Sequence, residues 1–256
     1  MNRLRVLLIA LCLSLLLAGL YHGANYYEEE KVLPQNNSPE HAFQGWMRKV
    51  YGKKQYSQHN EELIIRDFFN DRIGGVFVDV GASHYQTNST TYYLEKNLEW
   101  QGVAIDAIKT FEDGYLKNRP NTQFFSFYVS DVSDQEVDFY INLRNDRLSS
   151  GIKSLAKRQG KFREQTTYSI TLNDLLSRLE IERVDFLSMD IELAEPAALA
   201  GFDINKYRPS LVCVEAHPEV RSEIVEYFQE NKYKIVEKYR GLDPLNFYFT
   251  PMQVSR

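Results

Sequence analysis

The chain has 256 residues, of which 43% are apolar and 25% are charged, and its formal net charge is −5. This is the composition of a globular protein, and the acidic balance disfavours proteins that bind nucleic acids by neutralising phosphates. The two cysteines, Cys12 and Cys213, lie far apart in apolar stretches, which excludes a disulfide framework and a cysteine-based zinc site. The length suits one α/β domain with a short additional segment.

Near the N-terminus, an apolar run from Val6 to Leu20 follows Arg3 and Arg5. The run is shorter than the roughly 17–25 residues of most membrane-spanning helices. We interpret residues 1–24 as a signal anchor, that is, a single-pass transmembrane segment, with a cleaved signal peptide and a buried helix as alternatives. Basic residues before the run and acidic residues after it favour a non-cytoplasmic domain, in a secretory lumen or the periplasm, and the cytosolic face stays open.

The segment 25–55 is interpreted as a stem or linker, because the residues from Asn36 to Pro39 are typical of a loop. The pattern changes at Tyr56, and we expect one folded domain over residues 56–256. A helix is predicted to begin after Asn60, which has the side chain of a good N-cap residue.

Seven short runs rich in β-branched or aromatic residues predict strands, with helix-like segments between the first five. The runs are Val76–Val80, Gly102–Asp106, Gln123–Val129, Val184–Met189, Ser210–Glu215, Tyr233–Glu237 and Asn246–Thr250. This alternation predicts an α/β, Rossmann-like fold with a mostly parallel sheet covered on both faces. The last two runs are separated by a turn with Gly241, Asp243 and Pro244, so we expect them to pair antiparallel at the end of the sheet.

Each of the first five predicted strands is followed by acidic residues, at the sheet edge where ligands bind in such folds. The polar residues after these strands are Asp79, Asp106, Asp131, Asp190 with Glu192 and Glu195, and Glu215 with His217. Taken singly, such residues are also typical of strand ends and helix caps. Together they repel one another unless a cation lies among them.

S-adenosylmethionine supplies such a cation, and its ribose suits the acid after the second strand. Gly81 follows the first strand and allows a close approach of the backbone to a ligand. Neither GxxxxGK[ST] nor GxGxxG is present, which disfavours ATP, NAD and FAD and also a nucleotide-sugar enzyme of the Rossmann type.

Several segments carry a family resemblance in their order and spacing. They are Tyr56-Ser57-Gln58-x-x-Glu61, Phe77–Ala82, Asn88–Lys96, Trp100–Gly102, Thr171–Leu176, Val184–Glu192, Gly201–Asp203 and Arg208–Glu215. With these segments the chain resembles the FkbM family of S-adenosylmethionine-dependent methyltransferases, from Tyr56 to about Thr250. The resemblance implies a seven-stranded methyltransferase fold, S-adenosylmethionine as cofactor, and methyl transfer, usually to a hydroxyl.

The resemblance also implies roles for individual residues. Those expected on the cofactor are Asp79, Gly81 and Ala82 at the methionine end, Asp106 at the ribose and Asp131 near the adenine. Those expected at the donor and acceptor are Asp190 and Glu192. The candidates for the base that removes the acceptor's proton are Asp190, then Glu192, then His217. The acceptor is expected to be a sugar or other glycan, a lipid or a small metabolite, and no nucleic-acid partner is expected.

Two departures from the family pattern open alternatives. Ala107 follows Asp106 where the family commonly has proline, and Leu193 replaces a common glycine. A leucine there is expected to crowd the acceptor pocket or to mark lost catalysis, so a non-catalytic membrane-anchored binding or scaffold protein is the alternative function. No metal is assigned, although Asp190, Glu192 and Glu215 offer the oxygen ligands that divalent cations prefer.

Overall fold

The computed structural model describes residues 39–253 of the chain. The segment 1–24, interpreted above as a signal anchor, lies outside these residues. Between residues 39 and 253, none of the helices combines the length and the apolar character needed to cross a bilayer. Contacts between residues divide the chain into two units, 1–43 and 44–256, and the fold described below is that of the second unit.

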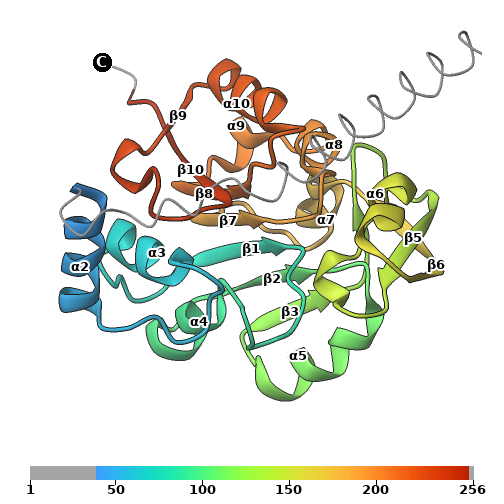
Figure 1. The fold of residues 1–256 in the computed structure, drawn as a ribbon, viewed down its shortest axis with the longest axis horizontal. Coiled ribbons are helices and arrows are strands. Elements are labelled where there is room, and N and C mark those ends of the chain that lie inside the picture. The colour runs from blue at the N-terminus through green and yellow to red at the C-terminus, as the bar shows by residue number, and fades with distance from the viewer. Residues whose placement is uncertain (1–38, 254–256) are drawn as a thin grey trace, which may run out of the picture. The chain divides into compact units, whose positions relative to one another are not determined.

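A seven-stranded sheet forms the centre of this unit (Figure 1). Its strands are β1 (Val76–Val80), β2 (Gln101–Ile105), β3 (Thr122–Phe125), β7 (Phe186–Met189), β8 (Leu211–Glu215), β9 (Tyr233–Ile235) and β10 (Asn246–Pro251). Their order is β3-β2-β1-β7-β8-β10-β9. The neighbours from β3 to β8 pair parallel, and β10 pairs antiparallel with both β8 and β9. The predicted parallel sheet with an antiparallel last pair is therefore confirmed.

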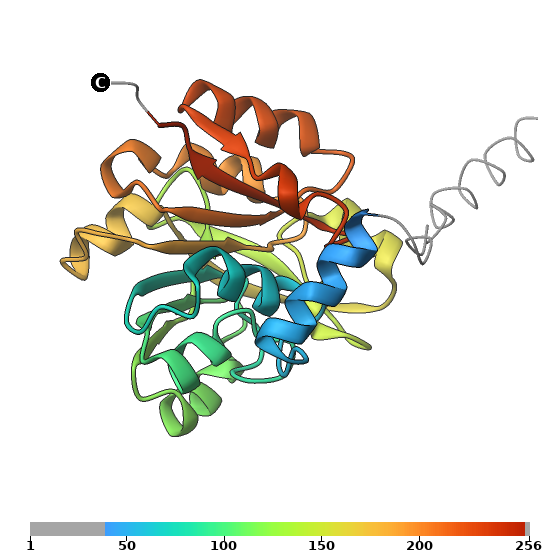
Figure 2. The same cartoon turned by 90° about the vertical axis from the view of Figure 1, so that its left-hand side faces the viewer.

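Helices cover both faces of the sheet, as the two views show (Figures 1 and 2). The helices that lie wholly in the second unit are α3 (Glu61–Phe69), α4 (Tyr92–Leu98), α5 (Glu112–Asn118), α6 (Lys153–Gln159), α7 (Leu172–Arg178), α8 (Glu195–Ala200), α9 (Ile204–Tyr207) and α10 (Arg221–Glu230), while α2 (Pro39–Tyr51) begins in the first unit. On one face, Val78 and Val212 pack in one buried cluster with residues of α7, α8, α9 and α10. On the other face, Ala104 packs against Tyr115 of α5, and α3 contacts β8. Successive strand residues point to opposite faces, so strands that are apolar throughout fit a sheet covered on both faces.

A second sheet of three strands stands apart from the first, with α6 beside it (Figure 1). It contains β4 (Tyr128–Val129), β5 (Glu136–Asn142) and β6 (Phe162–Ile170) in the order β4-β6-β5. The predicted third strand, Gln123–Val129, is therefore wrong in its extent, because its two ends belong to different sheets. The strands β5 and β6 were not predicted. Four of the nine residues of β6 are exposed, and its mostly polar sequence lacks the apolar run of a central strand.

The stretch from Pro39 to Tyr51, part of the segment interpreted as a stem, forms a helix. The predicted helix start after Asn60 is confirmed, because α3 begins at Glu61. The side chain of Asn60 makes no capping hydrogen bond to α3, and its amide instead donates to the carbonyl oxygen of Leu242 at 2.5 Å. Asn60 therefore joins α3 to the segment that precedes β10.

Candidate active site

A cavity of about 200 Å³ lies at the carboxyl ends of β1, β2, β7 and β8. Its acidic lining residues are Asp79, Asp106, Asp146, Asp190, Glu192 and Glu215. Among the described residues that line it, Arg147 is the one with a cationic side chain. This excess of carboxyl groups makes the cavity suitable for a cationic ligand.

Gly81 sets the distance between the loops that follow β1 and β7. Its φ is +80°, and a Cβ atom placed there would lie 1.8 Å from the carbonyl oxygen of Asp190. The amide N–H groups of Gly81 and Ala82 both donate to the carbonyl oxygen of Ile105, at 2.9 and 3.1 Å. Only glycine combines this backbone conformation with so close an approach, so the residue shapes the floor of the cavity.

Asp106, directly after β2, holds the turns on both sides of the cavity. Its carboxylate oxygens accept hydrogen bonds from the backbone N–H groups of Ser83, at 2.9 Å, and Ile108, at 2.8 Å. Burial raises the pKa of Asp106 to about 6, against the lowering effect of these two bonds. Each oxygen keeps a second lone pair, so the carboxylate can still accept from the hydroxyl groups of a ribose. The buried hydroxyl of Ser83 has no partner among the described residues, and it also lines the cavity.

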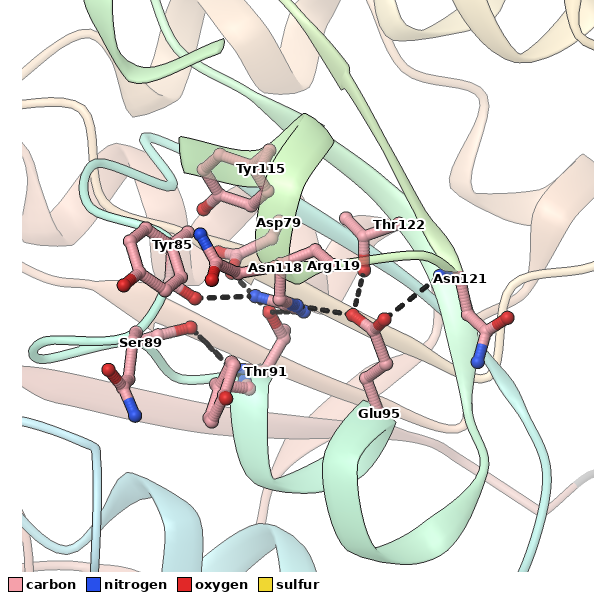
Figure 3. Close-up of polar contacts among 12 residues, drawn as sticks. Asp79, Tyr85, Ser89, Thr91, Glu95, Tyr115, Asn118, Arg119, Asn121 and Thr122 are labelled. Carbon is pink, nitrogen blue, oxygen red and sulfur yellow. Dashed lines mark hydrogen bonds and ion pairs between the residues drawn. The ribbon is translucent and has the colours of Figure 1, made fainter. Parts of the chain in front are cut away.

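Asp79, at the end of β1, joins the cavity to a buried network of polar side chains (Figure 3). Its carboxylate accepts from the Thr91 hydroxyl at 2.8 Å, and that hydroxyl accepts from the Arg119 guanidinium at 3.2 Å. Arg119 is in turn paired with Glu95. Burial raises the pKa of Asp79 to about 6, although Thr91 and Arg119 both favour its ionised form. Asp79 is thus both a lining residue and a structural one.

The acids after β7 and β8 lie close together. One carboxylate oxygen from each of Asp190, Glu195 and Glu215 lies within 4.8 Å of the other two. Burial and the neighbouring carboxylates raise the pKa of Glu215 to about 10, and burial raises the pKa of Asp190. The sequence-based alternative for a metal site included Glu192 in place of Glu195, so the structure changes one of its three residues.

Glu192 has the properties of a proton acceptor at neutral pH. Burial, and next Asp190, raise its pKa to about 7. One of its carboxylate oxygens accepts from the side-chain amide of Gln159 at 2.9 Å, which fixes the side chain at the cavity. A base works best when its pKa lies near the operating pH, so Glu192 suits general-base catalysis better than an ordinary exposed carboxylate.

The structure brings together six of the eight predicted site residues, and two lie elsewhere. The six that line the cavity are Asp79, Gly81, Ala82, Asp106, Asp190 and Glu192. Asp131 is exposed and accepts from its neighbour Ser130, while the Nδ1 atom of His217 accepts from the backbone N–H of Glu219 at 3.4 Å. Neither Asp131 nor His217 lines the cavity.

Other lining residues were missed by the sequence analysis. Arg147 comes from a short 3-10 helix, η2 (Asp146–Leu148), and its guanidinium bonds the side-chain oxygen of Gln58. Aromatic side chains at the cavity come from Phe127, Tyr128 and Phe139. Gln58 lies in a segment that carries the family resemblance, which was a usable signal. Nothing in the sequence marked Arg147, because the strands on both sides of η2 were not recognised.

Leu193 does not line the cavity. Its φ is +74°, and the preceding Glu192 has a φ of +55°. The backbone here is left-handed, a conformation that glycine adopts at little cost. The glycine common in the resembling family therefore fits the backbone at this position, and the expected crowding of an acceptor pocket is not observed in this cavity.

A comparison with protein families identifies most of the domain that contains this cavity. A family model described as the methyltransferase FkbM domain matches residues 79–235, which run from the end of β1 to the end of β9. The matched residues include all six acids that line the cavity. No curated protein matches the chain.

Solved structures with a similar arrangement are distant in sequence. One is a TehB-like SAM-dependent methyltransferase from Corynebacterium glutamicum, with 14% identity, coverage of 83% of this chain and 97% of that chain, and a TM-score of 0.44. Another is a putative RNA methyltransferase from Pyrococcus horikoshii, with 14% identity, coverages of 89% and 92%, and a TM-score of 0.36. A third is the 1,6-didemethyltoxoflavin-N1-methyltransferase of Burkholderia thailandensis with bound S-adenosylhomocysteine, with 13% identity, coverages of 82% and 84%, and a TM-score of 0.37.

Proposed function

The chain belongs to the FkbM methyltransferase family, and from that membership we propose that it transfers a methyl group from S-adenosylmethionine to a hydroxyl oxygen. The acceptor class that we propose is a sugar or other glycan, a lipid or a small metabolite. The observation that carries the proposal is the charge of the cavity, in which six carboxyl side chains and one guanidinium meet at the carboxyl end of the sheet. A sulfonium and an ammonium group are the cations that S-adenosylmethionine would place among them.

We propose the following roles for the residues that line the cavity. Asp106 accepts hydrogen bonds from the ribose hydroxyls, and the backbone at Gly81 allows the methionine end to lie close to the sheet. Phe127 and Tyr128 offer apolar surface to the adenine ring, on the side of the cavity away from β8.

Methyl transfer requires that the acceptor oxygen, the methyl carbon and the sulfur lie in line. The acceptor's oxygen–carbon bond forms as the carbon–sulfur bond breaks, and the hydroxyl proton passes to a base. Glu192, with its pKa raised to about 7, is the residue that we propose for this step, with Asp190 beside it. Loss of a general base typically lowers the rate by about 10²–10⁴-fold.

The first experiment measures donor binding by calorimetry on the wild-type chain, on Asp106→Ala and on Asp113→Ala, whose side chain is exposed on α5. Asp106→Ala should weaken binding of S-adenosylmethionine, because hydrogen bonds to a charged group contribute roughly 1.5–3 kcal/mol. Asp113→Ala should leave binding unchanged. Since Asp106 also holds the backbone of Ser83 and Ile108, melting temperatures must accompany the affinities. Equal affinity in all three proteins would show that Asp106 does not bind the ribose of the donor.

The second experiment screens acceptors with isotopically labelled donor, and compares the wild-type chain with Glu192→Gln in single turnovers. Transfer to hydroxyl compounds that drops in the variant, with donor affinity retained, supports the proposal. The alternative of a non-catalytic binding or scaffold protein predicts donor binding without turnover of any acceptor.

We also propose that residues 1–24 attach the chain to a membrane, with the remainder on its non-cytoplasmic side. The support is the apolar run Val6–Leu20 with Arg3 and Arg5 before it. The full chain should then fractionate with membranes, and a chain that begins at Asn25 should not. Recovery of the full chain in the soluble fraction at its full mass would contradict the anchor.

A further inference from the structure

We propose that Asp190, Glu195 and Glu215 bind a divalent cation such as Mg²⁺, Mn²⁺ or Ca²⁺ at the wall of the cavity. The binding of the ion stands independently of methyl transfer, whereas its role in the reaction rests on the proposed function.

The three residues come from different elements that the fold holds together. Asp190 directly follows β7, Glu215 ends the neighbouring strand β8, and Glu195 is the first residue of α8. One oxygen of each lies within 4.8 Å of the others. Two ligands on opposite sides of a Ca²⁺ ion, each about 2.4 Å from it, are about 4.8 Å apart. The spacing therefore allows all three oxygens to contact one ion, with a small contraction for Mg²⁺.

Glu195 provides a second and separate observation. Its side chain is 0% exposed, so water in the cavity does not solvate it. One of its oxygens accepts from the backbone N–H of Ile191 at 2.8 Å, but the other, Oε2, has no hydrogen-bond partner among the described residues. A buried polar atom without a partner is costly, and a bound cation would remove that cost.

No side-chain cation neutralises the group. Among residues 39–253, none of the ion pairs includes Asp190, Glu195 or Glu215. The guanidinium of Arg147 lies near enough to favour the ionised form of Asp190, but its hydrogen bond is to Gln58. Among the described residues, the three carboxyl groups therefore lie close together with no ion pair to offset their charge. A divalent cation would offset it.

The position of the group gives the ion a role. Asp190 and Glu215 line the cavity, while Glu195 is enclosed behind them. An ion held there would keep an open side toward the cavity, where a hydroxyl of the acceptor can bind. A bound cation lowers the pKa of such a hydroxyl, so that Glu192 removes its proton more readily.

The test titrates Mn²⁺ and Ca²⁺ into the full chain after treatment with a chelator, by calorimetry and by the electron paramagnetic resonance signal of free Mn²⁺. We expect saturable binding of one ion, weakened at least tenfold in Glu195→Gln and in Glu215→Gln. Glu219→Gln is the matched control, because that carboxylate lies near the same end of the sheet but is exposed and paired with Arg158. The control should bind like the wild type.

Glutamine at 195 keeps an acceptor for the Ile191 N–H, and metal-free melting temperatures will show whether each variant is folded. If Glu195→Gln does not fold, Glu215→Gln decides the question. Absence of saturable binding at millimolar Mn²⁺ and Ca²⁺, or binding that neither variant weakens, overturns the proposal. Binding of S-adenosylmethionine is also measured in the presence of chelator. Donor binding without metal binding would contradict only the metal site, and metal binding without donor binding would contradict only the proposed methyl transfer.

Discussion

The backbone at Gly81 has a φ of +80°, and Gly52 has a φ of +81° with nothing within 4 Å of an added Cβ atom. Both glycines therefore carry the same conformational demand, and only Gly81 lies against another part of the chain. Substitution at Gly52 therefore measures the loss of stability from the left-handed conformation alone. Substitution at Gly81 measures that loss together with the steric clash.

We predict that Gly81→Ala lowers the free energy of unfolding by about 2–5 kcal/mol and Gly52→Ala by about 1–2 kcal/mol. An L residue in this region costs roughly 1–2 kcal/mol, and overpacking against the Asp190 carbonyl adds roughly 1–3 kcal/mol. Urea denaturation of both variants measures the difference. An equal loss of unfolding free energy in the two variants would mean that the clash with the Asp190 carbonyl oxygen costs nothing, because the loops after β1 and β7 move apart easily.

Leu193 also has a left-handed backbone conformation, but its side chain makes that conformation more costly than it would be for glycine. We predict that Leu193→Gly is more stable than Leu193→Ala by about 1 kcal/mol, because both variants remove the leucine side chain and only glycine relieves the left-handed conformation. Donor affinity should not change in either variant, since Leu193 does not line the cavity. A glycine variant less stable than the alanine variant, or a changed affinity, would contradict this account.

At the scale of elements, the network in Figure 3 joins β1, α4 and the segment after α5. Arg119 pairs with Glu95, donates to the Tyr85 carbonyl oxygen at 2.9 Å and reaches Asp79 through Thr91. Glu95 also accepts from the backbone N–H of Asn121 at 2.9 Å and from the Thr122 hydroxyl at 2.5 Å. The pair thus fixes the position of α4 against the start of β3.

We predict that Arg119→Met lowers the free energy of unfolding by about 3–5 kcal/mol, because it leaves the buried Glu95 carboxylate without its cation. The control is Arg240→Met, which removes an exposed pair with Glu237 and should cost less than about 1 kcal/mol. Both values come from chemical denaturation. Comparable small losses would show that the Glu95 carboxylate is neutral or well solvated in the folded protein.

The elements also show which parts of the structure the sequence could predict. The central strands β1, β7 and β8 are almost wholly buried, so their apolar runs are visible in the sequence. The acids at the ends of β1, β2 and β7 follow from strand direction alone. By contrast, Asp131 follows β4, a strand of the second sheet, so proximity to a strand end did not place it at the cavity. Arg147 comes from the 3-10 helix η2, between two strands that the sequence did not reveal, and its contact with Gln58 is long-range, so no local pattern encodes it.

For the whole molecule, buried carboxyl groups with raised pKa values make stability depend on pH, and Asp79 and Asp106, each with a pKa of about 6, are two of them. Between roughly pH 4 and pH 6 the folded state keeps protons that the unfolded chain has released, so stability must fall as the pH rises through that window. Without ligand and in chelator, we predict a loss of about 3 kcal/mol from these two groups between pH 5 and pH 8.

Denaturation at a series of pH values measures this slope. Asp79→Asn should remove only the share of Asp79, about 1.4 kcal/mol between pH 5 and pH 8, because the amide does not titrate, while Glu192 and Glu215, with pKa values raised to about 7 and about 10, still contribute. Donor affinity should change in the opposite direction and increase as the carboxylates ionise. The claim that the pKa values of these carboxyl groups are raised in the folded state would be wrong if the domain gained stability from pH 5 to pH 8. It would also be wrong for Asp79 if Asp79→Asn kept the wild-type slope.

The strand order also bears on how the protein is made. β10 follows β9 in the chain, yet it lies between β8 and β9 and provides the hydrogen bonds that join them. At typical rates of about 5–20 residues per second, a ribosome releases β9 before the strand that connects it to the sheet. During that interval β8 is an open edge, which is a template for pairing with other chains. Pairing of β10 with β8 is therefore the step that closes this side of the sheet.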